Sequence, residues 1–144
     1  MAITTNAICN SFKKELLEAK HDFTASTGSV FKLAMYTSAA TLGKSTTSFT
    51  TGSETSSPAG YTSGGKALVN TGTSVASSVA ITNFSNLSFT NVTLTARGAL
   101  IYNTSNANTA VAVLDFGGDK TATSGTFTIQ FPAFTTSAAI LRIS

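Results

Sequence analysis

The chain has 144 residues, a length that fits one domain, with 42% hydrophobic residues, only 10% charged residues and a formal net charge of +3. The abundance of Phe, Leu, Val and Ile argues against intrinsic disorder, one cysteine excludes an intrachain disulfide scaffold, and no apolar run reaches the ~20 residues of a membrane-spanning helix. The 26 Thr and 19 Ser residues favour an all-β protein with an uncharged surface, because β-branched Thr suits a pleated sheet.

Residues 6–22 are predicted to form the single helix of the chain. Ile8, Phe12 and Leu16 recur at four-residue spacing and so fall on one helical face, while the charged residues of the segment fall elsewhere. The same charged residues argue against a secretion signal. The apolar face must be covered, so Phe12 and Leu16 either enter the chain's own core or dock on a partner. We favour the core.

Residues 30–36 are predicted to form a strand, because the period of the apolar residues changes to two. Residues 37–65 are rich in Thr, Ser and Gly, and their sparse apolar anchors are Leu42, Phe49 and Tyr61. Loops longer than ~12–15 residues in a compact domain are usually functional. We therefore expect this loop to reach a neighbouring molecule and to offer exposed strand edges to it. Deleting residues 45–57 is then expected to abolish assembly while leaving the fold intact.

The rest of the chain is predicted to be a series of short strands separated by turns. The apolar residues near 87–95 require one bulge or a change of face between Phe89 and Val92. The strand near 110–116 is apolar on both faces and is predicted to be central. The strands lie near 66–70, 75–82, 87–95, 97–103, 110–116, 125–131 and 138–143, with turn signals at 70–72, 83–86, 103–108 and Gly117-Gly118.

Seven or eight strands at a spacing of about ten residues are typical of two-sheet β proteins. The sequence therefore predicts a mainly β, single-domain antiparallel β-sandwich or jelly roll, with one N-terminal amphipathic helix, over residues 1–144. The helix is expected to cover a sheet edge or to dock on a neighbour.

Few side chains can carry proton-transfer or nucleophilic chemistry. His21, the single histidine, lies at the end of the predicted helix beside Asp22, where it can be a carboxylate-oriented general base or simply a histidine at the negative end of the helix dipole. Cys9 has the character of a half-buried thiol. One Cys and one His cannot build a structural zinc site. We favour the structural interpretations and predict no catalytic residue, metal or cofactor, so the chain is not expected to be an enzyme.

Four further charged residues lie beside or near glycines. Asp115 and Asp119 flank a Gly-Gly pair, but Ca²⁺ needs six to eight oxygens, and a turn with solvated acids is the preferred interpretation. Lys66 follows Gly64-Gly65 without the spacing of a phosphate-binding loop. Arg97 is either one half of an inter-subunit ion pair or a charge at the end of a strand, and both alternatives stay open.

Four segments carry a resemblance to a known family: residues 31–43 (FKLAMYTSAATLG), 60–68 (GYTSGGKAL), 95–103 (TARGALIYN) and 110–120 (AVAVLDFGGDK). They resemble small structural proteins of tailed bacteriophages, and the likeness covers most of the chain from the predicted helix to about residue 131. The resemblance implies a non-enzymatic virion protein that is assembled in the host cytoplasm. The lack of internal disulfides agrees with that compartment.

The resemblance further implies a capsid decoration or cement protein that stabilises the head through lattice contacts with the major capsid protein or other virion proteins. A homo-oligomer is expected, and a trimer is a plausible symmetric form. A tail, adaptor or head-to-tail connector component is the alternative within the virion. A receptor- or carbohydrate-binding module is the third, with Tyr61 as the platform for a sugar ring. Nucleic acid and membrane are not expected as partners, since the cations form no stripe. The predicted interaction residues are Phe12, Leu16, Leu42, Phe49, Tyr61 and Arg97.

Overall fold

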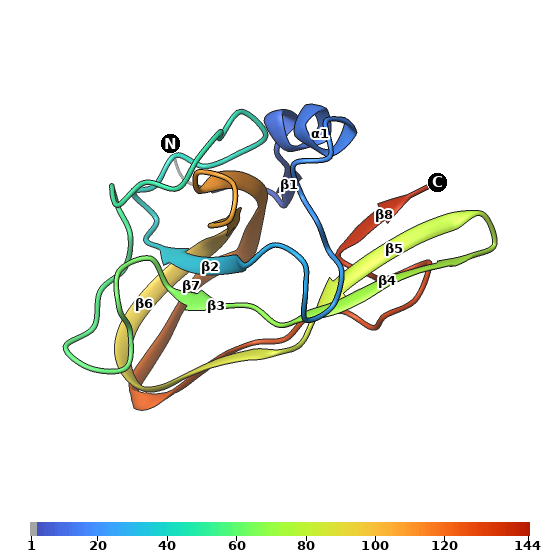
Figure 1. Cartoon of the computed structure of the whole chain (residues 1–144). Coiled ribbons are helices and arrows are strands. Elements are labelled where there is room, and N and C mark those ends of the chain that lie inside the picture. The colour runs from blue at the N-terminus through green and yellow to red at the C-terminus, as the bar shows by residue number, and fades with distance from the viewer. Residues whose placement is uncertain (1–2) are drawn as a thin grey trace.

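The computed structural model describes residues 3–144 as two antiparallel sheets and one short helix (Figure 1). The elements are β1 (Ala7–Ile8), α1 (Asn10–Leu17), β2 (Phe31–Tyr36), β3 (Lys66–Ala67), β4 (Asn70–Ala76), β5 (Val79–Phe84), β6 (Leu87–Asn103), β7 (Thr109–Ile129) and β8 (Leu141–Ile143). The five-stranded sheet has the order β1-β7-β6-β2-β3, and the three-stranded sheet has the order β4-β5-β8. The prediction of a mainly β chain with one helix is confirmed, and the arrangement is consistent with a β-sandwich.

The centre of the five-stranded sheet is fully buried. β2 pairs with residues 98–103 of β6, and five of its six residues are buried. Residues 110–113 of β7 are buried on both faces, and β7 lies between β1 and β6. The prediction that the strand near residues 110–116 is central is therefore confirmed.

A chain of aromatic rings connects the two sheets. Phe23 stacks on Phe31 of β2 with the ring centroids 4.5 Å apart, and Phe31 meets Phe84 of β5 edge-on at 5.7 Å. Phe12 of α1 contacts Phe23 at 6.0 Å, and Phe131 contacts Phe84 at 5.6 Å. Aromatic pairs at these separations add to the stability gained from burial, so this cluster fixes how the helix and the small sheet sit on the large one.

β6 and β7 form one long hairpin, where the sequence predicted four separate strands. The predicted turn at Gly117-Gly118 is wrong, because these residues lie in a bulge within β7, where the register shifts opposite residues 96–98 of β6. Asn91, Gly117 and Ser124, which have positive φ angles, all lie at register shifts. The predicted bulge between Phe89 and Val92 is confirmed. Bulges restore the inward alternation and let a long strand bend.

β4 and β5 also form a hairpin, and here the sequence prediction was wrong. A strand was predicted at 75–82 and a turn at 70–72, but the turn falls at Ser77-Ser78, inside that predicted strand. Both serines have positive φ angles, 50° and 63°, as two-residue turns of type I′ require. Serine carries a weaker turn signal than Asn-Gly, which is why the hairpin was missed.

The helix is shorter than predicted. α1 covers eight residues, and the segment before it forms β1, in which Ala7 pairs with Val113 and Ile8 with Ala112. Ala19, just beyond the end of the helix, has a φ of 58°, which stops the helical path. The pairing with β7 therefore delays the start of the helix, and the left-handed Ala19 ends it, although the apolar period alone predicts a longer helix. Over the described residues, no helix has the length and apolar character needed to cross a membrane.

Candidate functional site

The three predicted anchors of the long loop contact the chain's own domain. Leu42 and Phe49 are partly buried against the core, and the Phe49 ring stacks on Tyr102 with the centroids 4.6 Å apart. Tyr61 is only 8% exposed, and its ring lies against Phe89 at 5.3 Å. A sugar cannot stack on a ring covered in this way, so the structure does not offer Tyr61 as a carbohydrate platform.

Glu54, the single charged residue between Lys44 and Lys66, fastens the end of the loop. Its Oε1 accepts hydrogen bonds from Tyr61 Oη and from the backbone N–H of Gly64, both at 2.7 Å, and its Oε2 accepts one from Ser63 Oγ at 2.8 Å. Tyr61 Oη in turn accepts the backbone N–H of Met35 at 2.9 Å. The carboxylate thus ties the loop to the C-terminal end of β2.

The same loop covers the outer edge of the distal part of β6. Thr55 Oγ1 donates to the carbonyl of Thr95 at 3.0 Å, and the N–H of Thr93 donates to Ser57 Oγ at 3.0 Å. Single bridges join Glu54 to Tyr36 and Ser48 to Thr109. The expectation that residues 37–65 present exposed strand edges to a neighbour is therefore wrong where these contacts form. Deleting residues 45–57 would damage the fold, because it would remove Phe49, Glu54 and these bonds.

The helix places its predicted residues on the domain itself. Phe12 is 3% exposed within the aromatic cluster, and Leu16 packs partly buried against the core. Cys9 is the N-cap residue, with its side chain buried and no side-chain cap bond. Burial, with a smaller contribution from the nearby Glu15 carboxylate, raises the pKa of the Cys9 thiol to about 11. The thiol therefore stays protonated near neutral pH and is a poor nucleophile.

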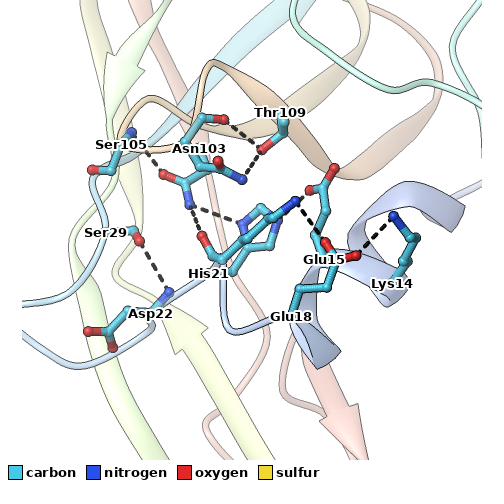
Figure 2. A network of polar contacts seen from close by, with 11 residues as sticks. Lys14, Glu15, Glu18, His21, Asp22, Ser29, Asn103, Ser105 and Thr109 are labelled. Atoms are coloured by element: carbon cyan, nitrogen blue, oxygen red, sulfur yellow. Dashed lines mark hydrogen bonds and ion pairs between the residues drawn. The ribbon is translucent and has the colours of Figure 1, made fainter.

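His21 lies in a buried polar network beyond the end of the helix, not on its last turn (Figure 2). Its Nε2 lies 2.7 Å from Glu15 Oε2, and its Nδ1 lies 3.0 Å from Asn103 Nδ2. The N–H of Ser105 donates to Asn103 Oδ1, which leaves the amide nitrogen of Asn103 to donate. Nδ1 of His21 is therefore the acceptor and Nε2–H donates to Glu15, whereas Asp22, the partner considered from sequence, bonds Thr24.

This network joins α1 to the end of β6. Within the described chain, the ring nitrogens of His21 contact only Glu15 and Asn103, and the ring packs at 4.8 Å from Phe12 and 6.3 Å from Phe31. No hydroxyl or thiol of residues 3–144 hydrogen-bonds to His21 in a way that would activate a nucleophile. The geometry fits a structural connection between the helix and the long hairpin.

Arg97 pairs within its own chain. Its Nε lies 3.3 Å from Asp115 Oδ1 across the β6–β7 ladder, and both side chains are mostly buried. Arg97 also lies within β6, so it is not a charge at the end of a strand. Asp115 Oδ1 accepts the N–H of Gly117 as well, at 2.9 Å. Among residues 3–144, no three His, Cys, Asp or Glu side chains gather as a metal site.

The exposed apolar surface lies mainly elsewhere, on residues that the sequence interpretation did not select. Leu17 of α1 is 90% exposed, and Val75 of β4 and Ile143 of β8 are 70% and 59% exposed. A groove of about 890 Å³ is lined by Leu16 and Leu17 of α1 together with residues of β5 and β8, including Ile143. Figure 1 shows the β4–β5 hairpin projecting from the body of the molecule beside this region. Recognising the Ser77-Ser78 turn would have located the hairpin from sequence.

No family model, curated protein or solved structure matches this chain. Four segments singled out in the sequence analysis, residues 31–43, 60–68, 95–103 and 110–120, fall together in space. They contain β2, β3, the second half of β6 and the first part of β7, and these strands are hydrogen-bonded neighbours in the five-stranded sheet. The four segments thus contribute adjacent strands to one sheet.

Proposed function

We propose that the chain is a non-enzymatic structural protein of a phage virion, and specifically a capsid decoration or cement protein. The observation that carries this proposal is the uncovered apolar surface of the small sheet and the neighbouring helix, marked by Leu17, Val75 and Ile143. Contiguous exposed apolar surface is typical of sites that bind other macromolecules. The resemblance of the core segments to virion proteins supplies the class of partner.

The charged and titratable side chains bond to other groups of the same domain, which supports a binding role. His21, Glu15, Glu54, Arg97 and Asp115 all bond within the domain. The loop that first suggested a binding arm is fastened to the sheet, which makes the body rigid. A rigid body with a small exposed sheet suits repeated contacts on a lattice, where many weak contacts add up.

The partners proposed are the major capsid protein or other virion proteins, with further copies of this chain beside it. Quantitative mass spectrometry of purified particles, with heads and tails separated, tests this. A cement protein should be present in hundreds of copies in the head fraction, whereas a connector should be present in about a dozen. Recovery with tails, or in a few copies, would favour the tail, adaptor or connector alternative. Absence from particles would refute a virion role.

A pair of surface variants tests which face binds. Ile143→Lys places a charge on the exposed face of the small sheet, and Val30→Lys places one at an exposed site that precedes β2. Both positions are at least half exposed, so both variants should fold. We expect Ile143→Lys to lower the copy number on particles and Val30→Lys to leave it unchanged. Equal copy numbers for the two variants would exclude the small sheet as the binding face.

A further inference from the structure

The outer edge of β4 has no partner strand within residues 3–144. β4 is hydrogen-bonded to β5 alone, and residues 73–76 are all exposed. One bulge between Asn70 and Thr73 shifts the register, but Thr73, Ser74, Val75 and Ala76 then pair with β5 in unbroken register. This stretch is therefore a regular, accessible edge, and such edges are ready templates for another strand.

This edge also lacks the charges that usually protect an edge strand. Residues 67–96 contain no charged residue and no proline, although the whole chain has a net charge of +3. The other edges differ: β8 carries Arg142, the free part of β7 carries Asp119 and Lys120 and is bulged, and β1 and β3 are two residues long. Native edges are commonly blunted by charge, proline, bulges or short length, and residues 73–76 have neither charge nor proline.

An apolar row crosses the small sheet and ends at this edge. Val75 lies opposite Ala80 of β5, and Ala80 lies opposite Ile143 of β8. Directly opposite residues of antiparallel strands share a face, so these three side chains form one row. All three are exposed. The row has no continuation beyond Val75 in the described chain.

We propose that β4 pairs with β4 of a second copy of this chain, antiparallel about a twofold axis at Val75. The two small sheets then become one six-stranded sheet, and the apolar row continues from Ile143 of one copy to the partner's Ile143. In this register Ser74 lies opposite the partner's Ala76. This contact names a partner for the exposed sheet, and its role in assembly rests on the virion function proposed above.

A second copy fits this edge better than a charged partner does. Self-pairing brings two net-positive molecules together, which is normally unfavourable, but the stretch from 67 to 96 places no like charges in contact. Two Val75 side chains, each mostly exposed in the single chain, become cross-strand neighbours. The contact is isologous, as twofold interfaces are, and so it closes without forming fibres.

Cysteine cross-linking of the full chain tests the contact directly. Cys9 is buried with a raised pKa, so Val75→Cys introduces the only accessible thiol. With a short bismaleimide, Val75→Cys should form a covalent dimer at least about tenfold faster than Leu17→Cys, because paired strands raise the effective concentration of the two thiols. Leu17→Cys is the matched control, since position 17 is even more exposed but lies on α1. Equal rates for the two variants would overturn the proposal.

Charge complementation gives a second test that folding defects cannot imitate. Adding Ser74→Lys to Val75→Cys places two lysines diagonally across the axis and should slow cross-linking, and Ser74→Glu should do the same. An equimolar mixture of the two double variants should cross-link faster than either alone, because the diagonal pair is then oppositely charged. No gain in the mixture would refute this register. These rates are measured on the purified chain, so their failure is distinct from absence of the chain from particles.

Discussion

The long loop and the β4–β5 hairpin join the core in opposite ways. Residues 37–65 contain no strand of either sheet, yet Phe49, Glu54 and Tyr61 tie them to the five-stranded sheet. β4 and β5 are regular strands, yet residues 73–76 of β4 are exposed throughout. Regular backbone pairing and attachment to the core are therefore separate properties here. The loop is attached to the core, and the hairpin is the surface that we propose for partners.

The largest expected effect is at the glycine that closes the loop onto β2. Gly65 and Gly117 share a φ of +76°, but a Cβ on Gly65 would lie 1.8 Å from the carbonyl oxygen of Leu33, whereas a Cβ on Gly117 meets nothing within 4 Å. Gly117→Ala should cost about 1–2 kcal/mol from the left-handed backbone alone. Gly65→Ala adds overpacking and should cost about 3–5 kcal/mol in total.

Denaturant unfolding of both variants measures this difference. Because the φ angle is matched, the gap between the two free energies of unfolding reports mainly how closely the loop packs on β2. Equal losses would mean that the loop lies away from the strand in solution, and the contrast between loop and hairpin would then fail.

The next effect is at the carboxylate that fastens the loop. Glu54→Ala removes the acceptor of three hydrogen bonds and leaves Tyr61 Oη and the N–H of Gly64 without it. Hydrogen bonds to charged groups are worth about 1.5–3 kcal/mol each, and partial exposure reduces the sum, so a loss of about 2–3 kcal/mol is expected. Glu54→Gln keeps one oxygen in place and should lose less. Thermal and denaturant unfolding give both values, and a neutral Glu54→Ala would show that the loop is held without this residue.

A smaller loss is expected where the helix meets the long hairpin. Asn103→Ala leaves the buried Nδ1 of His21 without its partner and removes the partly buried bond from the N–H of Ser105, which should cost about 2 kcal/mol. Asn106→Ala removes a partly buried bond to Thr109 in the same turn and should cost about 0.5 kcal/mol. The nitrogen chemical shifts of His21 report its local hydrogen bonds, and a general loss of stability does not change them. They should show the Nε2–H tautomer in the wild type, and in Asn103→Ala the Nδ1 shift should change while Nε2–H still donates to Glu15.

The elements recovered from sequence are those fixed by local apolar alternation. The strand at 30–36, the bulge between Phe89 and Val92 and the central strand near 110–116 all follow from which side chains must face inward. The start of the helix was missed because it depends on a partner distant in sequence. Val113 and Ala112 convert residues 7–8 into a strand, and no local pattern around Ala7 contains that information.

The candidate interaction surface was less predictable for a related physical reason. Sparse apolar residues in a polar loop look the same whether they anchor the loop inward or dock outward, and only the contacts of Leu42, Phe49 and Tyr61 decide between these. Exposure of Val75 depends on a turn at Ser77-Ser78 and on the absence of a covering strand among residues 3–144. A missing neighbour leaves no mark in the sequence.

The tyrosines give a test of loop attachment by pH. Burial raises the pKa of Tyr36, Tyr61 and Tyr102 above the ordinary value of 10.0. The folded chain thus holds these protons more tightly than the unfolded chain does, so stability is unaffected below pH 10 and is lost as the pH rises above it. The chain has no Trp, so phenolate absorbance reads the three groups cleanly. Their ionisation should coincide with the loss of circular dichroism, and free titration near pH 10 in the folded chain would contradict the packing.

The smallest effect is expected at the hairpin edge, and it separates stability from assembly. Val75→Thr keeps a β-branched shape at an exposed position, so the free energy of unfolding should change by less than about 0.5 kcal/mol. The same change at Val92, which is fully buried in β6, places a hydroxyl in the core and should cost about 1–3 kcal/mol. Yet Val75→Thr also interrupts the apolar row, so it should weaken dimerisation as measured by sedimentation, whereas Val92→Thr should affect it only through unfolding. A substitution that leaves stability unchanged but weakens self-association marks an interface residue. If Val75→Thr destabilised the chain as much as Val92→Thr, the hairpin would be part of the core and the contrast with the loop would disappear.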